Sequence, residues 1–325
     1  MNFKNKNFQK WLKRGARVFV IMNIIAFFHA YKFTHFTDRD IERTQDVKQL
    51  SVGDKLKTVF FGMDNPRPCT NLFPPWVYQT VTIQSNKRLE AWWIKAESVL
   101  QKASDKKGTV IFFHSFSSEK SAMLNRVEVF LQMGYDVLMV DFMGSGGSEG
   151  NQSTVGFFEA EEVKSCFDFV KQKGEKSIYL FGTSMGAVAI LKAEHDYQMQ
   201  PKGILLEYPF GSMYATTAAR FHGMNAPAFP MAGLLVFWGG AQNGFWAFGH
   251  NPTEYAKSVT CPTLLMYGHQ DPTVSEAEIS EIFTNLKSNQ KTMSVYPKAG
   301  HESFLNEYRP EWTYDVTLFM NLTRF

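Results

Sequence analysis

The length, composition and charge of the chain are those of a globular protein, and they exclude several other classes. The 325 residues are enough for one large α/β domain with an insertion, or for two small domains. A hydrophobic fraction of 44% against a charged fraction of 20% excludes wholesale disorder, and a net charge of +3 from scattered basic residues gives no case for nucleic-acid binding.

The amino terminus combines positive charge with an apolar run. No acidic residue precedes Asp38, and the run from Val18 to Tyr31 is apolar except for Asn23 and His29. The basic residues before the run are Lys4, Lys6, Lys10, Lys13, Arg14 and Arg17. This layout is typical of a secretory signal or a signal anchor, although about 14 apolar residues are short for a full membrane span.

We therefore expect residues 1–34 to form an uncleaved membrane anchor, with the rest of the chain outside the cytoplasm. Two alternatives stay open. A cleaved signal would give a secreted or periplasmic protein. A helix that packs on the protein itself, or that lies at a membrane surface, would leave a cytoplasmic location possible.

Residues 35–76 are mixed and polar and predict a connector arm. One helix is expected from Val52 to Phe61, because Ser51 can cap its start and Gly62 can end it. The prolines that prevent regular structure after it are Pro66, Pro68, Pro74 and Pro75.

Regular structure is expected from residue 77 onward, so residues 77–325 are predicted to form one domain. Two alternating runs, Val77–Ile83 and Leu89–Ile94, predict an antiparallel hairpin. Strands then alternate with helices, which predicts a mainly parallel sheet with an antiparallel start and helices on both faces. The further predicted strands are Thr109–Phe113, Asp136–Val140, Ser177–Phe181, Gly203–Leu206, Pro262–Tyr267 and Lys291–Val295, and the helices between them are Ser121–Met133, Val155–Lys173 and Ala187–Ala193.

The alternation of predicted strands and helices stops at about residues 210–256, a stretch too long for a simple loop inside a compact domain. We predict a helical cap over the carboxyl ends of the strands. Its large apolar residues are Phe221, Met224, Phe229, Met231, Phe237, Trp238, Phe245, Trp246 and Phe248. For most of them the favoured interpretation is burial against the sheet.

The pentapeptide Gly182-Thr183-Ser184-Met185-Gly186 lies between a predicted strand and a predicted helix. In that context a Gly-x-Ser-x-Gly turn forms a nucleophile elbow, which lifts the serine hydroxyl clear of the sheet. Glycines are needed at its ends because side chains there would collide with the neighbouring strand and helix. The pattern alone is a weak signal, and the rest of the chain decides its meaning.

A serine nucleophile needs an adjacent base and a group that orients the base. His301 follows the last predicted strand, and Asp271 follows the strand before it. The carboxyl ends of parallel strands share one sheet edge, so Ser184, Asp271 and His301 are expected to meet there as a catalytic triad. Glu207, at the end of another strand, is the alternative acid.

An acyl-transfer site also needs donors for the developing oxyanion. The predicted donors are the backbone N–H groups of Met185 and Phe116, the second in the loop after the strand Thr109–Phe113. His114, in the same loop, is interpreted as structural. The cysteines Cys69, Cys166 and Cys261 have neither metal-ligand spacing nor the pattern of a disulfide framework, and no metal or organic cofactor is implied.

From about Val77 to its end, the chain resembles an α/β-hydrolase of the group that holds serine aminopeptidase-like and monoacylglycerol-lipase-like proteins. The matching motifs are His114-Ser115, Asp141-Phe142-Met143-Gly144-Ser145-Gly146-Gly147-Ser148, the elbow Gly182–Gly186, the turn Gly268–Asp271 and the pair Gly300-His301. The chain departs from the family pattern at Ser115, where glycine is usual, and at Met143, where an arginine is usual. Neither departure removes a catalytic group.

The combined prediction is a serine hydrolase that cleaves carboxylic esters with an apolar acyl group or lipid-like character. A serine aminopeptidase or amidase is the alternative, but it would need an acidic group to hold the substrate amine, and residues 210–252 contain none. A catalytically silent, membrane-tethered binding protein is the third hypothesis. The expected partners are a small-molecule substrate and the membrane, with no nucleic acid.

Overall fold

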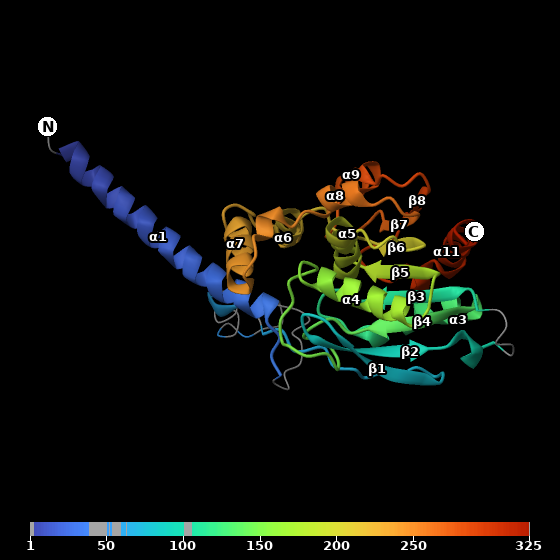
Figure 1. Ribbon diagram of the computed structural model, residues 1–325. Coiled ribbons are helices and arrows are strands. Elements are labelled where there is room, and N and C mark those ends of the chain that lie inside the picture. The colour runs from blue at the N-terminus through green and yellow to red at the C-terminus, as the bar shows by residue number, and fades with distance from the viewer. Residues whose placement is uncertain are drawn as a thin grey trace.

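The computed structural model describes residues 3–38, 51, 53, 60–62, 64–100 and 106–324. Within these ranges one eight-stranded sheet forms the centre of the molecule, in the order β1-β2-β4-β3-β5-β6-β7-β8 (Figure 1). The strands are β1 (Tyr78–Gln84), β2 (Arg88–Ile94), β3 (Gly108–Phe113), β4 (Tyr135–Val140), β5 (Ile178–Thr183), β6 (Gly203–Glu207), β7 (Thr263–Gly268) and β8 (Lys291–Tyr296).

Strand β2 is antiparallel to both β1 and β4, and all other neighbours in the sheet are parallel. This confirms the predicted α/β-hydrolase fold, a mainly parallel sheet with an antiparallel start. Each predicted strand lies within two residues of an observed one. The agreement has a physical cause, since β3, β4, β5, β6 and β7 are buried along their whole length and therefore read as continuous apolar runs.

Helices cover both faces of the sheet. One core cluster joins α4, α5 and α9 to side chains such as Ile111, Leu138 and Leu180, and the other joins α3 and α11 to the alternate residues Phe112, Met139 and Phe181. The elements on these faces are η4 (Lys120–Met123), α3 (Leu124–Gln132), α4 (Glu159–Gln172), α5 (Met185–Tyr197), α9 (Glu276–Asn285), α10 (Phe304–Glu307) and α11 (Arg309–Leu322), with η2 (Ala96–Ser98) after β2.

Helix α4 begins four residues later than the sequence predicted. Val155 and Gly156 have φ angles of 56° and 100°, which no α-helix accommodates. The carboxylate of Glu159 instead accepts hydrogen bonds from the backbone N–H groups of Thr154 and Gly156, at 2.9 and 3.0 Å. The prediction was wrong here because a tight turn, held by a side chain at the helix start, displaced the first turn.

Between β6 and β7 the chain forms a group of helices, as predicted for the cap. They are α6 (Met213–Gly223), α7 (Met231–Asn243), η5 (Ala247–Gly249), α8 (Pro252–Tyr255) and η6 (Ala256–Ser258). Its nine large apolar residues named above are all partly or largely exposed, so the expected burial against the sheet is wrong. The reason is that α7 packs on α1 and α6 and not on a face of the sheet.

Helix α1 (Phe3–Thr34) projects from the body of the molecule, and α7 lies beside its carboxyl-terminal half (Figure 1). By length and composition Phe8–Thr34 could cross a membrane, and most of this segment is exposed. A signal sequence meets the same criteria. The helix predicted at Val52–Phe61 lies largely outside the described residues.

Candidate active site

The turn between β5 and α5 holds Ser184 in a strained conformation. Its φ and ψ angles are 48° and −111°, and its backbone N–H donates to the carbonyl of Glu207 at 2.9 Å. A Cβ atom on Gly182 would lie 2.6 Å from the Ala187 nitrogen, and one on Gly186 would lie 2.2 Å from the Phe113 carbonyl oxygen. Both positions therefore require glycine, as expected for a nucleophile elbow.

Ser184, His301 and Asp271 meet at the carboxyl edge of the sheet. The Nε2 atom of His301 lies 3.1 Å from Ser184 Oγ, and its Nδ1 atom lies 2.7 Å from Asp271 Oδ2. The other carboxylate oxygen of Asp271 accepts the backbone N–H groups of Thr273 and Val274 at 2.7 and 2.9 Å. The Asp271 side chain has no exposed surface. This is the geometry of a nucleophile, a base and a group that orients the base.

Glu207, the alternative acid, makes a different set of contacts. Its Oε2 atom accepts two hydrogen bonds from the Arg126 guanidinium at 3.0 and 2.6 Å, and its Oε1 atom accepts the Trp312 indole N–H at 2.8 Å. Burial opposes the charge on Arg126, but the Glu207 carboxylate outweighs it and raises the pKa of the guanidinium. The buried pair lies beneath the elbow, and Asp271 is the carboxylate in contact with His301.

His114 organises the loop after β3. Its Nε2 atom accepts the backbone N–H of Phe142 at 3.0 Å, so the ring proton is on Nδ1, which donates to the Ser115 carbonyl at 2.8 Å. The side chain is fully buried, and burial lowers the pKa of His114, which keeps it neutral. Both ring nitrogens are thus engaged by the backbone, in agreement with a structural role.

The proposed oxyanion donors come from two segments, the start of α5 and the loop after β3. Met185 is the first residue of α5, where backbone N–H groups have no partner within the helix and the helix dipole favours negative charge. Phe116 is in the loop after β3, and its ring stacks on Phe33 with the ring centroids 4.5 Å apart. The next residue, Ser117, has a φ angle of 52° and donates from Oγ to the Asn65 side-chain oxygen at 3.0 Å.

Residues from the amino-terminal segment therefore support the Phe116 loop. Asn65 also donates from its amide nitrogen to the Phe33 carbonyl at 3.2 Å. The guanidinium of Arg220, from the cap, lies 4.3 Å above the Phe33 ring. Sequence reasoning missed Phe33 and Asn65, because partners separated by 52 or more positions leave no local pattern.

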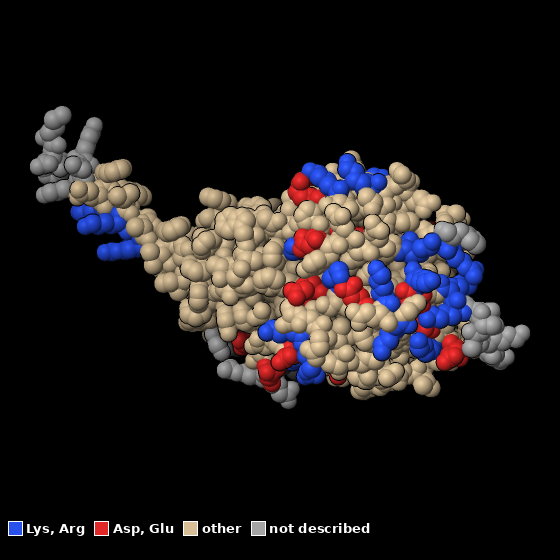
Figure 2. Space-filling view, in the orientation of Figure 1, with Lys and Arg blue, Asp and Glu red and all other residues tan. Residues whose placement is uncertain are grey.

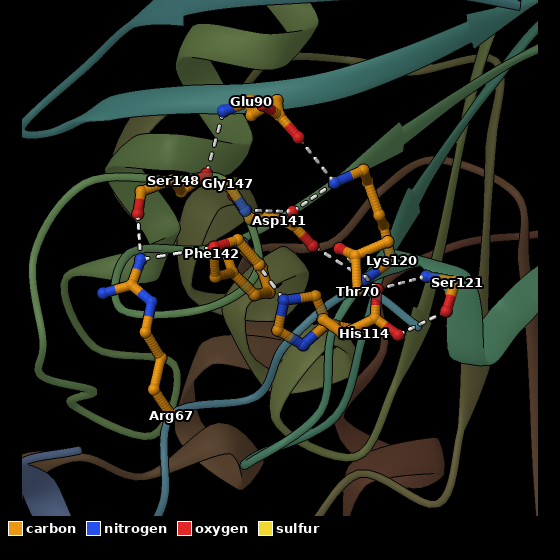
Figure 3. A network of polar contacts seen from close by, with 12 residues as sticks. Arg67, Thr70, Glu90, His114, Lys120, Ser121, Asp141, Phe142, Gly147 and Ser148 are labelled. Carbon is orange, nitrogen blue, oxygen red and sulfur yellow. Dashed lines mark hydrogen bonds and ion pairs between the residues drawn. The ribbon is translucent and has the colours of Figure 1, made fainter. Parts of the chain in front are cut away.

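Two cations from other segments, Lys120 and Arg67, contact the turn from Asp141 to Ser148, and the sequence analysis missed both (Figure 3). Lys120 is buried, contacts Asp141, pairs with Glu90 at 2.9 Å and lies 4.4 Å above the Trp92 ring.

Arg67, from the connector arm, donates to the carbonyls of Ser148 and Gly150. Met143 stands where an arginine is usual in α/β-hydrolases of this group. The backbone N–H of Met143 donates to the buried Glu162 carboxylate at 3.0 Å. Cations from distant segments thus supply positive charge to a turn that has none of its own.

No group of three or more histidine, cysteine or acidic side chains that could hold a metal ion occurs among the described residues. Cys69 is exposed and free, and Cys166 and Cys261 are free thiols in the core.

With the fold and this geometry established, comparisons with known proteins define the family. The model of the family "Serine aminopeptidase, S33" matches residues 104–234 and 243–308, more than half of the chain. The chain belongs to this family of α/β-hydrolases.

Curated relatives cover much of the chain at low identity. Uncharacterized protein YqkD of Bacillus subtilis (strain 168) is 22% identical over 221 residues, which cover 67% of this chain and 72% of that protein. Lysophosphatidylserine lipase ABHD12 of Macaca fascicularis is 24% identical over 196 residues, 56% of this chain and 48% of that protein.

Solved structures share the fold. The Pyrococcus furiosus esterase Pf2001 has a TM-score of 0.65 at 25% identity, over 81% of this chain and 100% of that chain. A bacterial membrane phospholipase A has a TM-score of 0.55 at 18% identity, over 76% of this chain and 87% of that chain, and at this identity the likeness concerns the fold alone. Family and fold together identify a hydrolase.

Proposed function

We propose that the chain is a serine esterase that cleaves carboxylic esters with an apolar or lipid-like acyl group. The observation that carries the proposal is the continuous contact from Asp271 through His301 to Ser184, at 2.7 and 3.1 Å. A serine hydroxyl hydrogen-bonded to an imidazole, which a carboxylate orients in turn, is the arrangement that activates serine for attack on a carbonyl.

In the proposed mechanism, Ser184 Oγ attacks the ester carbonyl carbon while its proton passes to His301 Nε2. The backbone N–H groups of Phe116 and Met185 stabilise the oxyanion, an effect worth about 10²–10³ in rate for one donor. The bond to the alkoxy oxygen then breaks, and that oxygen leaves as the alcohol with the proton from His301. Water repeats the sequence: His301 accepts a water proton, hydroxide attacks the acyl carbon, and Ser184 Oγ leaves with that proton.

Throughout, Asp271 holds the Nδ1 proton of His301 and stabilises the imidazolium. The two backbone N–H groups on its other oxygen keep this carboxylate fixed in the turn after β7. The alternative acid, Glu207, is already engaged by Arg126 and Trp312, which supports the assignment of Asp271.

Two features favour esters over amides of amino acids. Residues 210–252 contain no acidic side chain that could hold a substrate amine, and their aromatic content suits an apolar acyl group. An esterase and lysophosphatidylserine lipases among the similar proteins support the same class. An aminopeptidase or amidase activity is the alternative, because the family takes its name from a serine aminopeptidase.

We further propose that α1 anchors the protein in a membrane, with its basic start on the cytoplasmic side and the hydrolase domain outside the cytoplasm. Recovery of the full-length protein with membranes after a carbonate wash is the expected result. Complete recovery in the soluble fraction would contradict the anchor and leave the esterase proposal unaffected.

The catalytic proposal is tested with a fluorophosphonate probe, p-nitrophenyl esters of graded acyl length and aminoacyl anilides. The wild type should react with the probe and cleave the esters, whereas Ser184→Ala should lose labelling and at least about 10⁴-fold in kcat/KM. A folded wild type that does not label would support a silent binding protein. Preferential cleavage of the anilides would support the amidase.

A further inference from the structure

A band with almost no charged side chains lies at the junction of α1 and the cap. On the face shown in Figure 2, it separates the basic start of α1 from the charged surface of the hydrolase body. From Tyr208 to Thr253, which includes α6 and α7, the chain has one lysine, arginine or acidic residue, namely Arg220. Its guanidinium lies above the Phe33 ring.

Large apolar side chains in this band are exposed. In the cap they are Met224, Phe229, Phe237, Trp246 and Phe248, with exposed fractions between 39% and 83%. On α1 they include Phe19, Ile21, Ile24, Phe27 and Phe28, with fractions between 38% and 58%. An apolar surface of this kind needs a cover, since soluble proteins rarely expose contiguous apolar patches of such extent.

Several polar groups inside the band are paired within the protein, although the side-chain oxygens of Gln242 and Asn243 have no hydrogen-bond partner among the described residues. The Asn23 side-chain oxygen accepts the indole N–H of Trp238 at 3.2 Å, and the amide of Gln242 donates to the Phe27 carbonyl at 2.8 Å. The Phe27 and Trp238 rings meet edge to face at 5.2 Å. Internal partners of this kind lower the cost of placing polar atoms in hydrocarbon, where no water is present to satisfy them.

The lysines and arginines on the described start of α1 indicate what covers the exposed apolar surface. Lys10, Lys13, Arg14 and Arg17 adjoin the apolar run directly, as basic residues do where a helix leaves hydrocarbon for anionic headgroups. The run from Val18 to Tyr31 rises about 21 Å, less than the roughly 30 Å of a hydrocarbon core. Because α7 packs beside this run, the apolar band reaches beyond α1 into the cap.

We propose that the cap is immersed in the same lipid layer as α1, so that α7 and the exposed aromatic residues around it contact the acyl chains of a phospholipid bilayer. The cap begins a few residues after β6, at the sheet edge that carries Ser184. The immersed surface and the reactive serine therefore share one end of the molecule. This inference rests on the proposed esterase function, and it defines the substrate as an amphipathic ester that enters the site from the bilayer.

The experiment uses the full chain with Cys69→Ser, which removes the exposed thiol and keeps the two buried ones. Single cysteines replace Phe237, Trp246 or Phe229 in the cap, and Ile21 serves as the reference on α1. Tyr314 is the matched control, because it is 67% exposed on α11, at the opposite end of the molecule (Figure 1). Each cysteine carries a nitrobenzoxadiazole label in vesicles of phosphatidylcholine and phosphatidylglycerol.

Nitroxide-bearing lipids should quench the labels at positions 237, 246, 229 and 21 several-fold more than the label at 314, and aqueous iodide should show the reverse order. Cap labels that behave like the label at 314 would overturn the proposal, whatever the label at 21 does. A blue-shifted emission without nitroxide quenching would mean that a second copy of the chain covers the cap, and would overturn it too. Fluorophosphonate labelling of each variant is read separately, so a failure of the catalytic proposal leaves the quenching result interpretable.

Discussion

The two sides of the candidate active site are built in different ways. On the acid–base side, Ser184, Asp271 and His301 come from turns of the hydrolase domain, and their contacts lie within residues 184–301. On the side of the Phe116 loop, the supporting contacts come from Phe33 at the end of α1 and from Asn65 in the connector arm. One side follows from local turn chemistry, whereas the other depends on a segment far away in the chain.

This difference teaches that the end of α1 helps to support the hydrolase domain. The last residue of α1 and the chain just after it are paired with the body of the molecule, since the Thr34 carbonyl accepts the Ser153 N–H at 2.8 Å and the Phe36 N–H donates to the Asn151 carbonyl at 2.6 Å. A version of the protein that lacks the segment would keep the triad but lose the support of the Phe116 loop. The following changes test each side, from the largest expected effect to the smallest.

The acid–base side is broken most directly by Asp271→Asn. The asparagine keeps an oxygen for the N–H groups of Thr273 and Val274, but it presents no negative charge to His301 Nδ1. We expect kcat to fall by about 10⁴ with the melting temperature nearly unchanged. The control is Glu302→Gln, next to His301, which should retain most of the activity. An Asp271→Asn variant with more than a tenth of the wild-type kcat would contradict the assignment.

The contribution of the buried ion pair between Arg126 and Glu207 is tested by Arg126→Met. This change leaves the Glu207 carboxylate buried without its cation, so the free energy of unfolding should fall by about 3–5 kcal/mol, measured by urea denaturation. The double variant Arg126→Met/Glu207→Gln should recover a large part of the loss, because no uncompensated charge remains. A single variant as stable as the wild type would show that the pair contributes nothing.

On the loop side, Glu162 of α4 is a buried acid that accepts the Met143 backbone N–H from the Asp141 turn and has no cation among its hydrogen-bond partners in the described part of the chain. Burial, followed by the negative charge of Glu159, raises the pKa of Glu162 well above its usual value. The protonated form thus stabilises the fold fully below the unfolded-state pKa, and this contribution is lost as the pH rises through the folded-state pKa.

Glu162→Gln removes this titration. The free energy of unfolding of this variant, relative to that of the wild type, should therefore increase as the pH rises from 4 to 8. The increase should be about 1.4 kcal/mol per pH unit between the unfolded-state pKa and the folded-state pKa of Glu162. Urea denaturation at both pH values measures the change. A constant difference across this range would contradict the prediction.

The smallest effect is expected for Phe33→Ala, which removes the ring stacked on Phe116. Stacked aromatic pairs contribute about 0.5–1.5 kcal/mol, so kcat should fall by about two- to tenfold while KM changes little. The matched control is Phe28→Ala, on the same helix but in edge-to-face contact with Phe61, which should leave kcat unchanged. Equal losses in both variants would mean that the effect is a general one on α1.

The parts of the protein that the sequence predicted well share a physical basis. Strands buried on both faces are continuous apolar runs, which located β3 to β7, whereas an alternating pattern located the hairpin of β1 and β2. Because parallel strands bring their carboxyl ends to one edge, the order of Ser184, Asp271 and His301 along the chain sufficed to predict that they meet. The start of α4 could not be predicted, because the turn that donates to the Glu159 carboxylate displaced it.

By itself, then, the sequence determined the α/β-hydrolase fold and the meeting of three residues at one sheet edge, since both follow from short-range patterns and from strand direction. Only the tertiary structure decided how the Phe116 loop, the Asp141 turn and the cap are supported. Phe33, Arg67 and Lys120 reach these places across long stretches of chain, and a contact between distant residues leaves no periodicity or spacing to detect. Likewise, α7 packs beside α1 and α6 instead of on a face of the sheet, and this packing leaves aromatic residues of the cap exposed.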